Sequence, residues 1–286
     1  MTRTSRRTTP DFEHRRTVLV TGAGGGLGGA TARHLKDRGW IVVAADLPGP
    51  GLEAIGAHPH VVPVALDVAD EDSVQEAAGA IAGLGGLDAV VNFAGILEIG
   101  SVAELPVETV RRVLDVNVLG TYRVNRAVVP MIVDRRGRVV NISSETGWQS
   151  GGPFNGAYAM SKHAIEAYSD SLRRELALLG VRVVKVQPGP FRTAMTASVG
   201  DRFDAAAAGS ERFGPVIRGV GALAAKEEDS ASEPALLAEV VHRALTVARP
   251  RAAYSVKPGP SRVALEWLPT RVADGLLGLV LRRVGR

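Results

Sequence analysis

Cysteine is absent from the 286 residues of this chain. Without thiols the chain can form no disulfide framework, no thiolate zinc or iron–sulfur site and no cysteine nucleophile. Its chemistry therefore depends on oxygen and nitrogen side chains or on a bound cofactor. The composition is compatible with a reducing compartment, and we expect a cytoplasmic protein.

Long apolar runs are lacking at both ends of the chain. The N-terminal arginines are not followed by the apolar stretch of a secretory signal, and Asp11 and Glu13 disfavour a transit peptide. The C-terminal apolar run, Leu276 to Leu281, is far too short to cross a bilayer. We therefore expect no transmembrane segment, and we interpret residues 1–16 as a disordered basic arm.

An excess of positive charge is confined to the two ends. The chain carries a net charge of +4, of which residues 1–16 hold +3 and residues 271–286 another +3, so that the body carries −2. A slightly acidic body disfavours nucleic acid as a partner. The 45% of hydrophobic residues is sufficient for a sizeable core.

From Thr17 onward, short apolar runs alternate with amphipathic stretches. This pattern is typical of βαβ units with parallel strands buried on both faces. The expected strands are Thr17–Val20, Ile41–Ala45, Val61–Leu66, Ala89–Asn92, Arg138–Ile142, Val181–Gln187 and Ala253–Val256. The expected helices are Leu27–Arg38, Glu71–Ala82, Val107–Val133, Tyr158–Leu179 and Pro234–Ala248. The series predicts an α/β fold in which residues 17–259 form one Rossmann-type doubly wound parallel sheet of about seven strands, with helices on both faces.

Two segments depart from this alternation. Residues 194–233 are rich in Ala, Gly, Asp, Glu and Ser and contain no clear strand. A connection of this length in a compact domain is usually a lid or a disordered insert, and we interpret it as a lid over the substrate. Residues 260–286 form a C-terminal extension, which we expect to pack on the body or on a partner subunit, or alternatively to lie on a membrane surface.

The turn after the first expected strand is rich in glycine and includes Gly22, Gly26, Leu27 and Gly28. Such a turn lets a dinucleotide pyrophosphate approach the N-terminus of the following helix, where free N–H groups and the dipole favour an anion. The segment satisfies several glycine spacings at once. Because the spacing is ambiguous, the prediction of a dinucleotide site rests on the position of the segment, at the first βα turn of a doubly wound sheet.

Asp46 follows the second expected strand, about twenty residues after the glycines. A carboxylate at this place accepts hydrogen bonds from the ribose hydroxyls of adenosine and repels a 2′-phosphate. Neither the glycine turn nor the residues just after Asp46 supply an Arg or Lys for that phosphate. We therefore expect NAD rather than NADP.

Tyr158 and Lys162 stand four residues apart and share one face of an expected helix. A phenol is too weak an acid to serve as a base at neutral pH, and a neighbouring ammonium lowers its pKa by stabilising the phenolate. Ser144 follows an expected strand upstream, and Asn117 lies in an apolar setting where a buried amide needs partners.

Together these motifs make the chain resemble the short-chain dehydrogenase/reductase family in its single-domain form, over roughly residues 16–260. The resemblance rests on Thr21-Gly22 through Gly28, Asp67-Val68, Asn92-Phe93-Ala94-Gly95, Asn117, Ser144, Tyr158, Lys162 and Pro188-Gly189 through Thr193. It implies that Tyr158 is the general acid/base, that Ser144 hydrogen-bonds the substrate oxygen, and that Lys162 holds the nicotinamide ribose and lowers the pKa of Tyr158. Asn117 would anchor a water in the proton relay.

The resemblance also implies a cofactor site and a homodimer or homotetramer. The cofactor would meet Gly22, Gly26, Leu27, Gly28, Asp46, Asp67, Val68, Asn92, Ala94, Gly95, Tyr158, Lys162, Pro188, Gly189, Phe191 and Thr193. The substrate would meet Ser144, Trp148, Phe154, Tyr158 and Met195. Because the expected pocket is apolar, we expect hydride transfer between NAD and a secondary or lipophilic alcohol, or a ketone in reverse, as in relatives that act on retinoid, steroid or other lipid alcohols. Two alternatives stay open, a sugar-nucleotide epimerase or dehydratase and a dinucleotide-binding scaffold without turnover.

Overall fold

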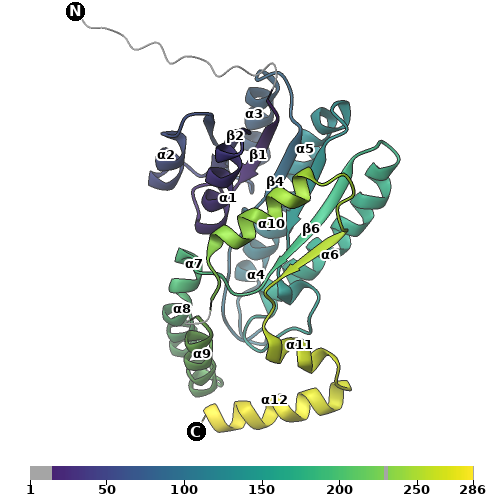
Figure 1. Ribbon diagram of the computed structural model, residues 1–286. Coiled ribbons are helices and arrows are strands. Elements are labelled where there is room, and N and C mark those ends of the chain that lie inside the picture. The colour runs from purple at the N-terminus through teal and green to yellow at the C-terminus, as the bar shows by residue number, and fades with distance from the viewer. Residues whose placement is uncertain (1–14, 229–230, 286) are drawn as a thin grey trace, which may run out of the picture.

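A computed structural model describes residues 15–228 and 231–285, so the expected arm lies almost entirely outside the described residues. The described residues form one sheet of seven strands in the order β3-β2-β1-β4-β5-β6-β7, with every neighbouring pair parallel. The strands are β1 Thr17–Thr21, β2 Ile41–Asp46, β3 Val61–Ala65, β4 Ala89–Asn92, β5 Arg138–Ile142, β6 Arg182–Pro188 and β7 Ala253–Val256 (Figure 1). The predicted fold class is confirmed.

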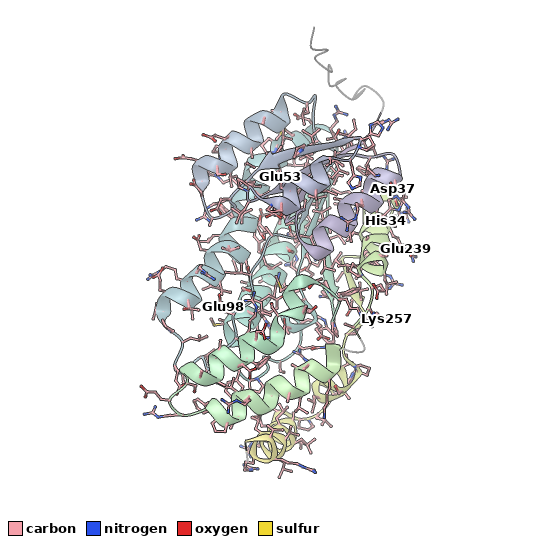
Figure 2. All side chains as sticks on the ribbon, turned by 90° about the vertical axis from the view of Figure 1, so that its left-hand side faces the viewer. His34, Asp37, Glu53, Glu98, Glu239 and Lys257 are labelled. Carbon is pink, nitrogen blue, oxygen red and sulfur yellow. The ribbon has the colours of Figure 1, made fainter. Side chains whose placement is uncertain are left out.

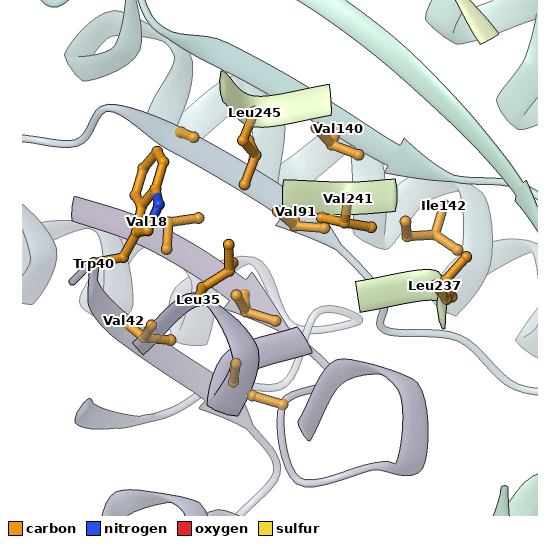
Figure 3. Packing of buried hydrophobic residues seen from close by; sticks show 14 of the residues in the cluster. Val18, Leu35, Trp40, Val42, Val91, Val140, Ile142, Leu237, Val241 and Leu245 are labelled. Carbon is orange, nitrogen blue, oxygen red and sulfur yellow. The ribbon is translucent and has the colours of Figure 1, made fainter. Parts of the chain in front are cut away.

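The central strands divide their side chains between two hydrophobic cores. In β1, Val18 and Val20 enter one core and Leu19 enters the other, as the alternation of side chains along a strand requires. The first core packs under α1 and α10, where Leu35 and Val241 meet the sheet (Figure 3). The second core packs under α3, α5 and the end of α6. Because both faces are covered, the strands read as continuous apolar runs.

The helices that cover the sheet largely follow the expected ranges. They are α1 Gly26–Asp37, α2 Pro50–Gly56, α3 Glu71–Ala82, α4 Val107–Leu114, α5 Thr121–Asp134, α6 Gly156–Ala177 and α10 Pro234–Thr246. At the outer side of the first core, His34 of α1 lies beside Glu239 of α10 (Figure 2). The single helix expected over residues 107–133 is interrupted by a π-helical segment, Asp115–Gly120, between α4 and α5.

The described part of the segment expected to be a lid contains three helices, α7 Ala194–Ala197, α8 Val199–Gly209 and α9 Gly214–Glu228. The helices α8 and α9 pack on each other around a small core of Phe203, Ala207 and Ile217. Apolar residues at helical spacing were thus present in a stretch whose composition suggested a loop.

The C-terminal extension forms α11 Pro260–Glu266 and α12 Thr270–Val284. It packs on the rest of the chain through α11, whose Glu266 accepts hydrogen bonds from Ser150, and through α12, which lies along α9 at the end of the sheet where α8 also lies (Figure 1). A Cβ atom at Gly219 of α9 would collide with the carbonyl oxygen of Val284, so glycine permits this close approach. No helix in the described part of the chain is long and apolar enough to cross a membrane.

Candidate active site

A cleft of about 470 Å³ opens at the carboxyl ends of the strands. In a doubly wound sheet the βα loops converge at this edge, on either side of the point where the strand order reverses between β1 and β4. The predicted site residues that line the cleft are Gly22, Gly26, Leu27, Gly28, Asp46, Asp67, Val68, Ala94, Gly95, Ser144, Tyr158, Lys162, Pro188, Gly189, Phe191, Thr193 and Met195. Of the predicted site residues, Asn92, Asn117, Trp148 and Phe154 are not in its lining.

The glycine turn is shaped by close backbone approaches. Gly22 has a φ of +66°, and a Cβ atom there would lie 2.9 Å from the backbone nitrogen of Ala94. A Cβ atom at Gly28 would collide with the carbonyl oxygen of Gly22. The helix α1 begins at Gly26 with no side chain capping its first turn. The turn thus leaves helix N–H groups facing the cleft without a side-chain partner, which is the arrangement that receives a phosphate.

Asp46 ends β2 at the base of this turn. Its Oδ2 accepts a hydrogen bond from the backbone N–H of Gly24 at 2.8 Å, and its Oδ1 accepts one from the N–H of Leu47 at 2.8 Å. These bonds fix the carboxylate at the cleft wall while leaving further lone pairs for a ligand hydroxyl. Lys162 is the one basic side chain among the described residues that line the cleft.

Tyr158 and Lys162 come from the first two turns of α6, and Ser144 comes from the loop after β5. The Ser144 hydroxyl is close enough to the Tyr158 phenol to lower its pKa. The Nζ atom of Lys162 donates to the carbonyl oxygen of Ile142 at 3.0 Å and lies 5.4 Å from the centre of the Tyr158 ring. The strand end and the helix therefore bring a hydroxyl, a phenol and an ammonium to one wall of the cleft.

The pKa of Tyr158 differs from the value expected from the sequence. Tyr158 keeps part of its surface open to the cleft, yet desolvation by the surrounding protein raises its pKa to about 12, opposed by the Ser144 hydroxyl and reinforced by the charge of Glu145. Burial lowers the pKa of Lys162 to about 8, with Glu166 acting in the opposite sense. The predicted lowering of the Tyr158 pKa by Lys162 is not found: desolvation of the phenolate is the largest cause of the shift, and Lys162 is not among its causes.

Asn117 lies within the π-helical segment and is 1% exposed. Its Oδ1 accepts from the N–H of Ile96 at 2.7 Å, while its Nδ2 donates to the carbonyl of Ile96 at 2.9 Å and to the Ser161 hydroxyl at 3.0 Å. The side chain thus ties the loop after β4 to α6, immediately behind the cleft. Short π-helical insertions of this kind occur frequently at functional sites.

Asn92 belongs to a buried amide network rather than to the cleft wall. Its Nδ2 donates to Oδ1 of Asn125 at 2.8 Å and to Oδ1 of Asn141 at 2.9 Å. The network continues from Asn125 to the hydroxyl of Tyr168 and from Asn141 to the hydroxyl of Ser169. These contacts join β4, α5, β5 and α6 below the site. Polar residues on otherwise apolar faces are the only sequence signal for such a network.

The predicted substrate residues separate into two groups. Ser144, Tyr158 and Met195 line the cleft, whereas Phe154 packs with the α8–α9 hairpin, its ring centre 5.9 Å from that of Phe213. Trp148 is 37% exposed and lies at the end of a short 3₁₀ turn after Ser144. Cleft residues that were not predicted as site residues are Gly25, Ala45, Leu47, Leu66, Phe93, Ile96, Val116, Ile142, Ser143 and Thr196. Gly25 and Phe93 lie within the quoted motifs and Ile96 falls near the expected pocket, whereas most of the others were signalled only by their predicted neighbours.

A sequence model described as short chain dehydrogenase matches residues 16–203. The chain is 41% identical over 192 residues to retinol dehydrogenase 16 of Homo sapiens. It is 39% identical over 185 residues to 17-beta-hydroxysteroid dehydrogenase type 6 of Bos taurus. Each alignment covers 63% of this chain and 58% of the relative.

Solved structures show the same architecture. A short-chain dehydrogenase from Streptomyces avermitilis superposes with a TM-score of 0.73 and 26% identity, covering 95% of both chains. An actinorhodin polyketide ketoreductase with NADPH gives a TM-score of 0.71 and 28% identity, covering 85% of this chain and 95% of its own. The matched residues include the glycine turn, Asp46, Ser144, Tyr158 and Lys162 of the cleft described above, and the chain belongs to the short-chain dehydrogenase family.

Proposed function

We propose that this protein is an oxidoreductase that transfers a hydride between NAD and a secondary or lipophilic alcohol, or the corresponding ketone in reverse. The observation that carries the proposal is the placement of Ser144, Tyr158 and Lys162 in one cleft with the glycine turn and Asp46. Membership of the short-chain dehydrogenase family supports an enzyme that acts on alcohol or keto groups.

The residues fit a dinucleotide. The glycine turn forms a cradle that a Cβ atom at Gly22 or Gly28 would obstruct, and the uncapped first turn of α1 faces it. Asp46 would accept hydrogen bonds from the adenosine ribose, and Lys162 would hold the nicotinamide ribose. The loop residues Ala94, Gly95, Pro188, Gly189 and Thr193 would line the remainder of the cofactor. When bound, the nicotinamide ring supplies the hydride acceptor or donor.

In this mechanism Ser144 donates a hydrogen bond to the substrate oxygen. The phenol of Tyr158, with its pKa near 12, is protonated at neutral pH and is therefore ready to donate a proton to a ketone that is being reduced. For alcohol oxidation Tyr158 has to lose that proton first, and the ammonium of Lys162 would stabilise the phenolate. Asn117 would hold the backbone of Ile96 in place and anchor a water of the proton relay.

The preference for NAD over NADP is supported by the charge around Asp46. A 2′-phosphate would face this carboxylate without a basic cleft residue other than Lys162, which lies with Tyr158 on the catalytic wall. The polyketide ketoreductase named above was solved with NADPH, so a protein of this fold can hold the phosphorylated cofactor. We therefore expect Asp46 to decide the choice in this chain.

The lid and the substrate class are supported by apolar side chains in the cleft. Ile96, Ile142 and Met195 are among its lining, and Met195 belongs to α7 of the proposed lid. The helix α8 is tied to the loop after β4 by Arg202, whose Nη1 donates to the carbonyl of Leu97 at 2.6 Å. The names of the curated relatives specify retinol and a hydroxysteroid, both lipophilic alcohols. We propose a substrate of the same class.

Oligomerisation and location complete the proposal. Large apolar side chains are exposed on the π-helical segment and α5, where Leu119 is 48% and Tyr122 47% exposed, and we propose a homodimer or homotetramer through these helices and α6.

On α12, Leu276 and Leu279 are exposed near Arg282, which would suit peripheral contact with an anionic membrane from the cytoplasm. Light scattering and liposome flotation test the two parts.

The deciding experiment measures the absorbance of reduced nicotinamide during turnover with each oxidised cofactor and a panel of secondary alcohols, retinoids, steroids and short sugars. We expect turnover of apolar alcohols with NAD and its loss in the Tyr158→Phe variant. NAD binding without any turnover would favour a scaffold. Redox-neutral conversion of a sugar nucleotide would favour an epimerase or dehydratase.

A further inference from the structure

The loop that carries Ser144 is held from behind by α11. This loop, residues 144–150, is called the serine loop below. The helix α11, residues 260–266, belongs to the C-terminal part of the chain, well beyond the end of the family match at residue 203. Its two ends contact the two ends of the serine loop.

The first contact involves Glu145, the neighbour of Ser144. Glu145 is 7% exposed, and its Oε2 accepts a hydrogen bond from the backbone N–H of Gly259 at 2.7 Å. Its Oε1 lies 3.4 Å from Nη1 of Arg262. A carboxylate that is buried to this degree needs such partners, because loss of its solvation is otherwise uncompensated.

The second contact involves Glu266, the last residue of α11. Its Oε1 accepts from the backbone N–H of Ser150 at 2.7 Å, and its Oε2 accepts from the Ser150 hydroxyl at 3.1 Å. Trp148, a predicted substrate residue, lies between the two contacts. The four hydrogen bonds and ion contacts together fix both ends of the serine loop to one short helix.

The chain segment that leads into α11 also supports the cofactor side of the cleft. The N–H of Gly189 donates to the carbonyl of Val256 at 2.9 Å. A Cβ atom at Gly189 would collide with the carbonyl of Lys257, which itself has a φ of 54°. Residues 256–266 therefore touch Gly189 on one side of the cleft and the serine loop on the other.

We propose that Gly259, Arg262 and Glu266 form a clamp that positions the serine loop and balances the charge of Glu145 beside Tyr158. The proposal rests on the function proposed above, in which Ser144 and Tyr158 act on the substrate. The clamp residues act through these two groups and touch neither substrate nor cofactor, so they are positioning residues.

Glu145 of the serine loop is the charged side chain that acts on the Tyr158 phenol, where it disfavours the phenolate, and Arg262 of α11 lies 3.4 Å from Glu145. On the α6 side, Nζ of Lys162 lies 5.4 Å from the centre of the Tyr158 ring, and Glu166 acts on Lys162 in turn. Loss of the Glu145 charge would favour the phenolate, whereas loss of the Arg262 charge would leave Glu145 less neutralised and disfavour it. The clamp therefore predicts effects of opposite sign from two neutralising substitutions that are in contact with each other.

The kinetic test compares Glu145→Gln with Arg262→Gln in the pH dependence of kcat/KM for alcohol oxidation. We expect the acid-side limb to move to lower pH in Glu145→Gln and to higher pH in Arg262→Gln, each by about half a pH unit. Arg271→Gln, at an exposed arginine of α12, is the matched control and should leave the limb in place. Shifts of the same sign, or no shift in either variant, would overturn the charge-balancing role.

The structural test needs no turnover, which separates failure of the clamp from failure of the proposed function. Hydrogen exchange of the serine-loop amides is measured in the cofactor-free protein for wild type, Glu266→Ala and the exposed control Asp274→Asn. We expect at least a fivefold faster exchange in Glu266→Ala and no change in the control. Unchanged exchange in Glu266→Ala would refute the clamp. A wild type without turnover but with a protected serine loop would refute the proposed function alone.

Discussion

The two sides of the cleft are built in different ways. On the cofactor side, Gly28 lies against the carbonyl oxygen of Gly22 within one turn, and Asp46 bonds to the N–H groups of Gly24 and Leu47 within the first βαβ unit. On the substrate side, the serine loop is held by side chains of α11, more than 110 residues later in the chain. Contacts between residues that are near in the sequence give a recognisable motif. Contacts between remote segments are signalled only by single polar residues.

The largest expected effect is on the turnover rate. It is tested by comparing two tyrosines of α6, Tyr158 and Tyr168, because burial raises the pKa of each to about 12. Tyr158→Phe should lower the turnover rate by about 10²–10⁴-fold, because it removes the proton donor. Tyr168→Phe removes only a hydrogen bond to Asn125, and it should lower the free energy of unfolding by about 1 kcal/mol with turnover retained. Equal rate losses in the two variants would contradict the assignment of Tyr158.

The next prediction compares the stability contributed by the core between α1 and the sheet with that contributed by the small core between α8 and α9. Leu35→Ala, in the core between α1 and the sheet, should lower the free energy of global unfolding by about 2–5 kcal/mol. Phe203→Ala, in the small α8–α9 core, should instead speed hydrogen exchange within α8 and α9 and raise KM. Denaturant unfolding and exchange mass spectrometry measure the two quantities. An equal loss of global stability in both variants would show that the hairpin is not an independent lid.

The cofactor side is tested through Asp46. Wild type should prefer NAD over NADP by at least about a hundredfold in kcat/KM, because the carboxylate repels a 2′-phosphate and accepts ribose hydroxyls. Asp46→Ala combined with Leu47→Arg should narrow or reverse this preference. A wild type that prefers NADP would show that a basic group outside the cleft reaches the phosphate.

The smallest effect is the pH dependence of cofactor binding through Lys162. Its pKa of about 8 means that the ammonium is present below pH 8 and is lost as the pH rises through that value. The dissociation constant for reduced cofactor should therefore increase by about tenfold between pH 7 and pH 9.5, as one charged hydrogen bond is lost. Isothermal titration of wild type measures this rise, and Lys162→Met should bind weakly at every pH. A flat profile in wild type would contradict a ribose contact by Lys162.

The sequence by itself determined the parallel sheet, the glycine turn and the grouping of Ser144, Tyr158 and Lys162. Apolar runs buried on both faces specify strands, parallel strand ends converge at one edge, and a four-residue spacing places two side chains on one helical face. The expected helix over residues 71–82 and the strand over residues 89–92 agree with the structure residue for residue.

Only the tertiary structure decided which partners Asn92, Phe154 and Glu145 have. Asn92 belongs to the buried amide network, Phe154 packs with the α8–α9 hairpin, and Glu145 accepts a hydrogen bond from Gly259 at the start of α11. The high pKa of Tyr158 was likewise set by desolvation, which depends on all the atoms around the phenol rather than on Lys162 alone. Burial and remote pairing are properties of the packed chain, and a single sequence records neither of them because the partners are separated by tens of residues.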